Sequence, residues 1–185
     1  LWSFFSECTN QGIQAIVARG DLLRKISFPK WIIVVSATIT ALINFLINLG
    51  VIIVFALANG VTPRLTWLLV PFVVLELYLL SLGIAFFLGA INVKFRDISS
   101  IWEVFMQALF YAIPIIYPIT MVAAASPSAA KIFLLNPIAQ VIQDVRFLLI
   151  TDQTITTWNY LPERFLHFIP LIIVLFILAL GGVYF

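Results

Sequence analysis

The stretch WIIVVSATITALINFLINLGVIIVFALA, residues 31–58, has no charged residue in twenty-eight positions and decides the fold class of this chain. As an α-helix it would be about 42 Å long, which is enough to cross a hydrocarbon core about 30 Å thick with some tilt. A second stretch of the same length, residues 65–92, carries a single charged residue, Glu76. The sequence therefore predicts two membrane-spanning helices.

The remaining chain extends this pattern. Residues 101–119 predict a shorter third span that closes with two prolines, and residues 167–185 predict a last span that the sequence truncates. Residues 1–17 are too polar to face lipid and suit a membrane helix buried in a bundle or lining an aqueous route. Only 10% of all residues are charged, against about a quarter in soluble domains, and the mean hydropathy is +1.16. We therefore expect an all-α polytopic membrane helix bundle, formed as a single transmembrane domain over residues 1–185.

Basic residues divide unevenly between the connecting segments. Residues 18–30 and 93–98 carry six Lys and Arg in nineteen positions, whereas residues 59–64 and 120–166 carry four in fifty-three. Cytoplasmic loops of membrane proteins are enriched in these two residue types. We therefore expect the first pair of segments on the cytoplasmic side and the second pair outside.

Prolines interrupt the chain near the outer end of the third span. Pro114 and Pro118 each remove a backbone donor and should bend or break that helix. A short helix is expected after Ser126-Pro127, within the outer stretch 120–166.

A further outer helix is expected to begin at Asn136-Pro137, because these residue types are preferred at the N-cap and first position, and to run through Ile150. Apolar residues gather on one face of this helix, and three polar residues gather on the other. This pattern predicts an amphipathic hairpin at the membrane interface. The polar residues are Gln140, Gln143 and Asp144.

Residue types that carry catalysis or metal binding are sparse. No phosphate-binding loop of the G-x-x-x-x-G-K-[ST] type is present, so any ATP must be bound by a partner. His167 is the only histidine and Cys8 the only cysteine, which favours a structural role near the interface for the first and a packing role for the second. We expect no catalytic residues, no metal site and no cofactor in this chain.

Polar residues within the apolar segments are candidates for a transport path. Glu76 lies near the middle of its span and must face water or the bundle interior, where it could be a gate residue or a buried structural carboxyl. Ser36, Thr40, Asn44 and Asn48 recur every four residues along one helix face. Such a stripe either bonds a neighbouring helix, the commoner use, or lines a hydrophilic path.

Residues 18–30 hold five of the eighteen charged residues and must lie in water. A short helix beginning at Gly20 would gather Leu22, Leu23 and Ile26 on one side. The segment is therefore either a solvated loop that only fixes orientation or a surface helix that docks on a partner.

Five stretches, taken in order along the chain, carry a family resemblance: WSFFSE at 2–7, DLLRKISFPK at 21–30, NVKFRDI at 92–98, IPIIYPI at 113–119 and LLNPIAQVIQDVRF at 134–147. Together they resemble the permease subunit of type-2 ABC exporters, specifically the group that exports O-antigen, capsule and teichoic acid. The resemblance covers nearly the whole chain, and its order, spacing and predicted sidedness agree.

The resemblance implies that residues 18–30 contain a cytoplasmic coupling helix and that residues 120–166 hold extracellular, re-entrant gate helices. It also implies that this sequence is a fragment lacking the family's N-terminal interface helix and first span. The coupling residues would be Asp21, Leu22, Leu23, Arg24, Lys25, Ile26, Phe28 and Pro29. A cytoplasmic lock between helices would be formed by Lys94, Arg96 and Asp97. Candidates for the transport path or gate are Glu7, Asn44, Asn48, Glu76, Tyr111, Pro114, Tyr117, Pro118, Asn136, Pro137 and Arg146.

The function implied is that of a half-transporter in a bacterial inner membrane. Two copies would pair with two ABC ATPase subunits, which bind ATP and Mg²⁺, and would move a lipid-linked polysaccharide or polyol-phosphate polymer outward. Membrane lipid is a further partner, and nucleic acid is not. Two alternatives stay open: an ABC exporter permease for drugs or lipids, and a membrane-embedded enzyme acting on lipid-linked sugars.

Overall fold

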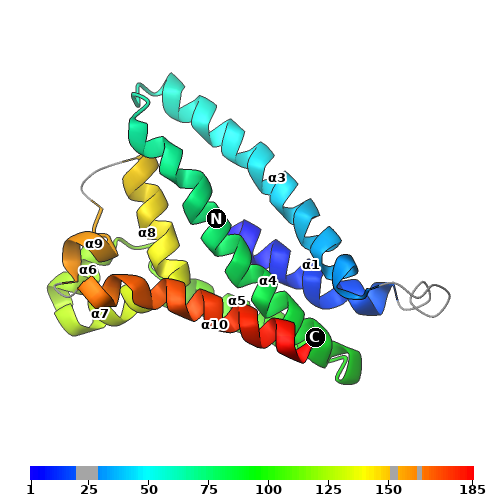
Figure 1. Ribbon diagram of the computed structural model, residues 1–185. Helices are drawn as coiled ribbons and strands as arrows, with labels where there is room; N and C mark the ends of the chain where they lie inside the picture. The colour runs from blue at the N-terminus through cyan, green and yellow to red at the C-terminus, as the bar shows by residue number, and fades with distance from the viewer. Residues whose placement is uncertain (20–28, 151–153, 162–163) are drawn as a thin grey trace. The chain divides into compact units, whose positions relative to one another are not determined.

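The computed structural model describes residues 1–19, 29–150, 154–161 and 164–185, and within these ranges it contains helices and no strand (Figure 1). The all-α fold class is therefore confirmed. The longer helices are α1 Trp2–Ala18, α3 Trp31–Ala58, α4 Val70–Lys94, α5 Ile98–Ala112 and α10 Ile169–Tyr184. The shorter helices are η1 Leu65–Leu69, α6 Ile119–Ala125, α7 Pro127–Leu135, α8 Pro137–Leu149, α9 Thr157–Tyr160 and η2 Arg164–Phe168.

Three helices in the described part of the chain are long and apolar enough to cross a membrane: Trp31–Ala58, Leu65–Lys94 and Phe165–Tyr184. The first has the bounds that the sequence predicts, and the second ends two residues later than predicted. The pair α7 and α8 passes the same test of length and apolar character together, but it is bent by 95°. This bend is the shape expected of a broken or re-entrant span.

The expected third span over residues 101–119 is interrupted, as its two prolines predict. α5 has 15 residues, or about 22 Å of rise, which is less than the roughly 30 Å of a hydrocarbon core. It ends at Ala112, two residues before Pro114, and the chain is helical again from Ile119, where Pro118 is the extended N-cap residue of α6. The two prolines break the helix as expected. They do so earlier than the sequence pattern indicated.

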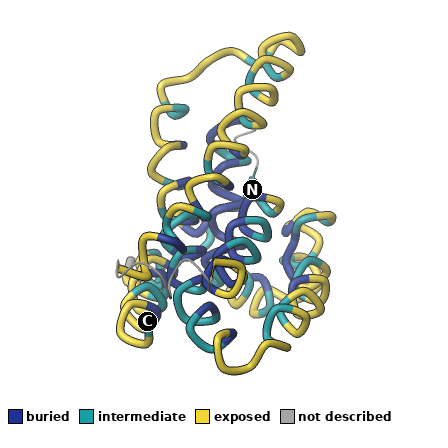
Figure 2. Tube along the Cα trace, turned by 90° about the vertical axis from the view of Figure 1, so that its right-hand side faces the viewer, coloured by how far each residue is buried: buried dark blue, intermediate teal, exposed yellow. Residues whose placement is uncertain are grey.

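The chain forms two compact units, and helices α3, α4, α5 and α10 each contribute residues to both. The first unit contains Leu1–Gly50, Tyr78–Ala108 and Leu175–Phe185, and the second contains Val51–Leu77 and Leu109–Val174. Buried residues occur within the residue ranges of both units, and Figure 2 colours buried positions dark blue along the trace. A single transmembrane domain over residues 1–185 stays a prediction.

Helices approach closely in the first unit because small residues face one another. A Cβ built on Gly12 would overlap the Cβ of Ala85, and one built on Gly89 would lie 3.4 Å from the Gly12 carbonyl oxygen. Ala85 and Gly89 are four residues apart on α4, and Ser81, one turn earlier, is fully buried. Small residues spaced four apart are typical of helices that approach closely within a membrane.

Helix α8 is the most buried element of the second unit, where eleven of its thirteen residues are buried. Its start is the one that the sequence predicts, because the Asn136 side chain accepts a hydrogen bond from the Ile138 amide (3.0 Å) and Pro137 follows as the first helical residue. The Ser126 side chain caps α7 in the same way. The sequence analysis expected an amphipathic hairpin here, and in α8 the polar face is buried as well as the apolar face. The interfacial position of this hairpin stays a prediction.

Candidate functional site: two polar clusters

The first cluster lies in the first unit and centres on Glu7 of α1. Its Oε1 atom accepts hydrogen bonds from Gln11 Nε2 (2.9 Å), one turn along the same helix, and from Asn44 Nδ2 of α3 (2.8 Å). Asn48 donates in turn to the Asn44 carbonyl oxygen (2.9 Å). The structure therefore brings together three of the predicted path residues, Glu7, Asn44 and Asn48. Hydrogen bonds to an ionised carboxylate are stronger than those between neutral groups, so this cluster can hold a charge within apolar helices.

The polar stripe of α3 points away from the interior of its own unit. Ser36, Thr40, Asn44 and Asn48 are all exposed, and Thr40 and Asn48 bond the carbonyl one turn earlier. An outward polar stripe on a span this apolar has to meet water or another protein helix. The two interpretations of the stripe, contact with a neighbouring helix and lining of a hydrophilic path, therefore stay predictions.

Two further hydrogen bonds fix α1 against its neighbours in the first unit. Trp102 Nε1 of α5 donates to Thr9 Oγ1 (3.1 Å), and Asn92 Nδ2 of α4 donates to the Ile13 carbonyl (3.2 Å). The sequence analysis missed these contacts, because Thr9, Trp102 and Asn92 lie far apart along the chain. An isolated Asn or Trp near the end of a span was the available signal. It does not indicate which helix supplies the partner.

The second cluster lies in the second unit and joins α4 to α8. Gln140 Nε2 donates to Asp144 Oδ2 (2.7 Å), and the Gln140 side chain also hydrogen-bonds Glu76. Asp144 and Gln140 are 9% and 8% exposed, whereas Glu76 is half-buried. Among the described residues, Glu76 Oε1 and Gln140 Oε1 are buried without a hydrogen-bond partner. Sequence reasoning identified Glu76 but placed Gln140 and Asp144 on a water-facing surface.

Side chains of helix α8 also hydrogen-bond backbone carbonyls of the broken segment between α5 and α6. Arg146 Nη2 donates to the Ile115 carbonyl (2.6 Å), and Gln143 Nε2 donates to the Pro114 carbonyl (3.5 Å). Tyr117 closes the same segment by donating to the Ala112 carbonyl (3.2 Å). Irregular backbone at membrane depth requires such partners because lipid offers none. The predicted gate residues Pro114, Tyr117 and Arg146 thus lie close together, and Gln143 is an addition.

The remaining predicted site residues make fewer contacts. Tyr111 is 71% exposed and Pro118 is exposed. The lock residues Lys94, Arg96 and Asp97 are exposed, and within the described ranges no ion pair joins them, so the lock stays a prediction. Residues 20–28, with all coupling residues except the exposed Pro29, lie outside the described residues.

The two clusters supply carboxyl and amide groups that can hydrogen-bond a polar group. No group of three or more His, Cys, Asp or Glu side chains occurs in the described part of the chain. Cys8 is buried and free, as a packing residue would be.

Comparison with known proteins identifies the family of this chain. Residues 1–150 match the ABC-2 type transporter membrane family. The chain belongs to this family. The resemblance found in the sequence is therefore confirmed, and this ABC-2 family chain is a multi-pass membrane protein.

Relatives of this ABC-2 chain share a description. It is 35% identical to the O-antigen export system permease protein RfbA of Myxococcus xanthus over 136 residues, or 74% of this chain and 52% of the relative. It is 25% identical to a Klebsiella pneumoniae protein of the same name over 173 residues, or 93% of this chain and 64% of the relative. The chain thus spans between about half and two thirds of the length of the curated relatives it matches.

Proposed function

We propose that the chain is the permease half of an ATP-driven exporter, which moves a lipid-linked polysaccharide or polyol-phosphate polymer outward across a bacterial inner membrane. The family match over residues 1–150 carries this proposal. The relatives named as O-antigen export permeases support the choice of a glycan cargo. The apolar spans and the two polar clusters are consistent with a polar route through a membrane protein.

ATP hydrolysis belongs, in this proposal, to a separate ABC ATPase subunit that binds ATP and Mg²⁺, and two copies of each chain form the transporter. A partner that changes shape with ATP can act on this chain only through contacts that differ between its two states. Residues 20–29 are the proposed docking helix, with Leu22, Leu23 and Ile26 filling a groove and Arg24 and Lys25 pairing with acidic groups. The exposed residues Lys94, Arg96 and Asp97 form a second cytoplasmic contact or a lock between helices.

The path and gate are assigned to the two polar clusters. The Glu7 and Asn44 pair, with the outward polar stripe of α3, offers hydrogen-bonding groups on an otherwise apolar span. The bent pair α7 and α8 with the proline-broken segment resembles an irregular gate, because side chains of α8 bond the carbonyls that the break frees. Glu76 is assigned to the gate because α8 supplies its hydrogen-bonding partner.

A charge reversal tests the coupling step. The double variant Arg24→Glu and Lys25→Glu, in the full-length protein, should lower both co-purification with the ATPase and export of surface polysaccharide, because like charges would then meet at the docking groove. The control is Lys131→Glu, which reverses an exposed lysine of α7 in the stretch expected outside. Normal co-purification together with wild-type export by the double variant would contradict the coupling role.

The cargo needs a separate test. In a strain that lacks its own permease gene, the full-length protein with its ATPase should restore polymer at the cell surface, detected with a polymer-specific antibody. Restoration of drug or lipid efflux without surface polymer would instead favour the alternative exporter classes. Turnover of lipid-linked sugar by the purified chain without ATPase would favour an embedded enzyme.

A further inference from the structure

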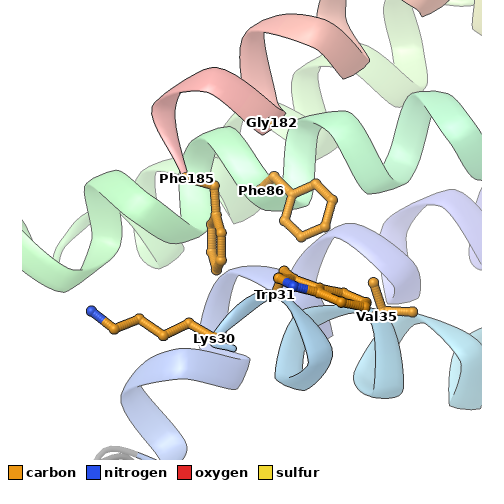
Figure 3. Close-up of a pocket in the computed structure, with 6 residues that line it drawn as sticks. All are labelled: Lys30, Trp31, Val35, Phe86, Gly182 and Phe185. Carbon is orange, nitrogen blue, oxygen red and sulfur yellow. The ribbon is translucent and has the colours of Figure 1, made fainter. Parts of the chain in front are cut away.

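A cavity of about 600 Å³ opens in the first unit, where α3 begins and α10 ends. Its lining residues come from α3, α4 and α10 and from the residue before α3, and Figure 3 shows their side chains around one space. They are Lys30, Trp31, Val35, Phe86, Gly182 and Phe185. The volume lies within the roughly 300–1,000 Å³ typical of small-molecule sites. None of these residues belongs to the polar clusters described above.

The lining is apolar except at one edge. Phe86 and Phe185 pack as a tilted pair with centroids 5.0 Å apart, and the ring of Trp31 lies across from them (Figure 3). Lys30 extends its amine away from these rings, and the residue is exposed. The site therefore combines an apolar space with one positive charge, that of Lys30, at its rim. A molecule that fills it needs an apolar body and an anionic end.

The position of the cavity identifies such a molecule. Trp31 is 52% exposed and is the first residue of a helix long enough to span a membrane, so it lies where a hydrocarbon core meets the polar surface. Lysine at this level keeps its stem in the apolar region and its amine in water. The basic residues of segment 18–30 place this end of α3 on the cytoplasmic side, where membrane surfaces carry anionic lipids.

We propose that this cavity binds an anionic phospholipid of the cytoplasmic leaflet. One acyl chain lies among Trp31, Phe86 and Phe185, and the phosphate of the headgroup pairs with Lys30. The lipid fills a space that the described residues of three helices leave open. It is a resident lipid and is distinct from the exported cargo.

Gly182 provides a way to fill the cavity without disturbing the helices around it. A Cβ built on Gly182 meets no atom within 4 Å, so Gly182→Leu extends its side chain into open space. Gly50 is the matched control, because it also lies in a helix and a Cβ there also meets nothing within 4 Å, but it does not line the cavity. Gly182→Met, with an unbranched side chain, is a second filling variant should the leucine variant not fold.

The experiment uses full-length protein in nanodiscs that contain phosphatidylglycerol with a photoactivatable group on one acyl chain. Labelled peptides are identified by mass spectrometry after illumination, and matched nanodiscs carry photoactivatable phosphatidylcholine. Peptides that contain Trp31 or Phe185 should be labelled above the peptides of other spans. Gly182→Leu should reduce the labelling of these peptides to the level of the peptides from other spans, whereas Gly50→Leu should leave it unchanged.

The pairing of the lipid phosphate with Lys30 is tested by removing the charge of that lysine. Lys30→Gln should lower labelling by phosphatidylglycerol roughly fivefold, the effect of one lysine near an anionic surface, and leave labelling by phosphatidylcholine unchanged. Lys94→Gln removes another exposed lysine at the end of a span and should have no effect. The proposal is wrong if the filling variant is labelled like the wild type, or if Lys30→Gln leaves the preference for phosphatidylglycerol intact.

Discussion

Gly181 and Gly182 follow one another near the end of α10, but an added methyl group has opposite consequences at the two positions. A Cβ at Gly181 would overlap the carbonyl oxygen of Gly83 on α4 and lie 3.2 Å from the Cα of Gly83. A Cβ at Gly182 meets nothing within 4 Å. Gly181→Ala should therefore lower the stability of the protein, and Gly182→Ala should raise it slightly.

The magnitude follows from two terms. Alanine in place of glycine favours a helix by up to about 1 kcal/mol, and this gain is similar at the two adjacent positions. At Gly181 the added carbon contacts backbone, which cannot rotate away, so α10 and α4 must separate at a cost of about 1–3 kcal/mol. The two alanine variants should then differ in free energy of unfolding by that amount.

This difference is measured by thermal unfolding of the full-length protein. The monodisperse peak in size-exclusion chromatography is recorded after heating to each temperature, and its loss reports unfolding. One kcal/mol corresponds to about 2–4 °C in a domain of this size, so Gly181→Ala should unfold at least about 2 °C below Gly182→Ala. Gly83→Ala should resemble Gly181→Ala, because its Cβ would lie 2.7 Å from the Leu178 Cα. Equal midpoints for Gly181→Ala and Gly182→Ala would refute the close contact between α4 and α10.

Two more predictions concern the second unit. Glu76→Gln keeps a hydrogen bond to Gln140 while removing one of two neighbouring carboxyl groups. Assembly with the ATPase should therefore persist, and export should change. Loss of the folded protein would show that the carboxyl is structural. Asn136→Ala removes the side chain that accepts a hydrogen bond from the Ile138 amide, and it should lower the free energy of unfolding by about 1 kcal/mol. Asn136→Asp keeps an accepting oxygen and should retain most of that free energy. Equal stability of the two variants in thermal unfolding would show that the cap is dispensable.

Patterns that depend on local chemistry were readable from the sequence. The bounds of α3 coincide with an uncharged stretch, and the starts of α7 and α8 coincide with a capping residue followed by proline. The helix breaks near Pro114 because proline lacks a donor wherever it stands. These features need no knowledge of the rest of the fold.

The polar face of α8 shows what local patterns do not reveal. Periodicity separates Gln140 and Asp144 from the apolar residues of the helix, but it does not say whether that face meets water or protein. Burial of the polar face depends on α4 and on the broken segment, which are distant in sequence. The pairing of Glu7 with Asn44 depends in the same way on how α1 and α3 pack.

The contacts of α8 divide its polar residues into two groups with different explanations. Gln143 and Arg146 donate to carbonyls that the proline break leaves free, so the need to satisfy backbone within an apolar setting accounts for them. Glu76 and Asp144 satisfy no backbone group in the described structure; they share the amide of Gln140, whose own oxygen lies buried without a partner. Apolar side chains of similar size would pack the same space without the desolvation cost of two carboxyl groups. The need to satisfy free backbone groups therefore explains the first group and does not account for the second, so the retention of Glu76 and Asp144 requires a reason other than stability.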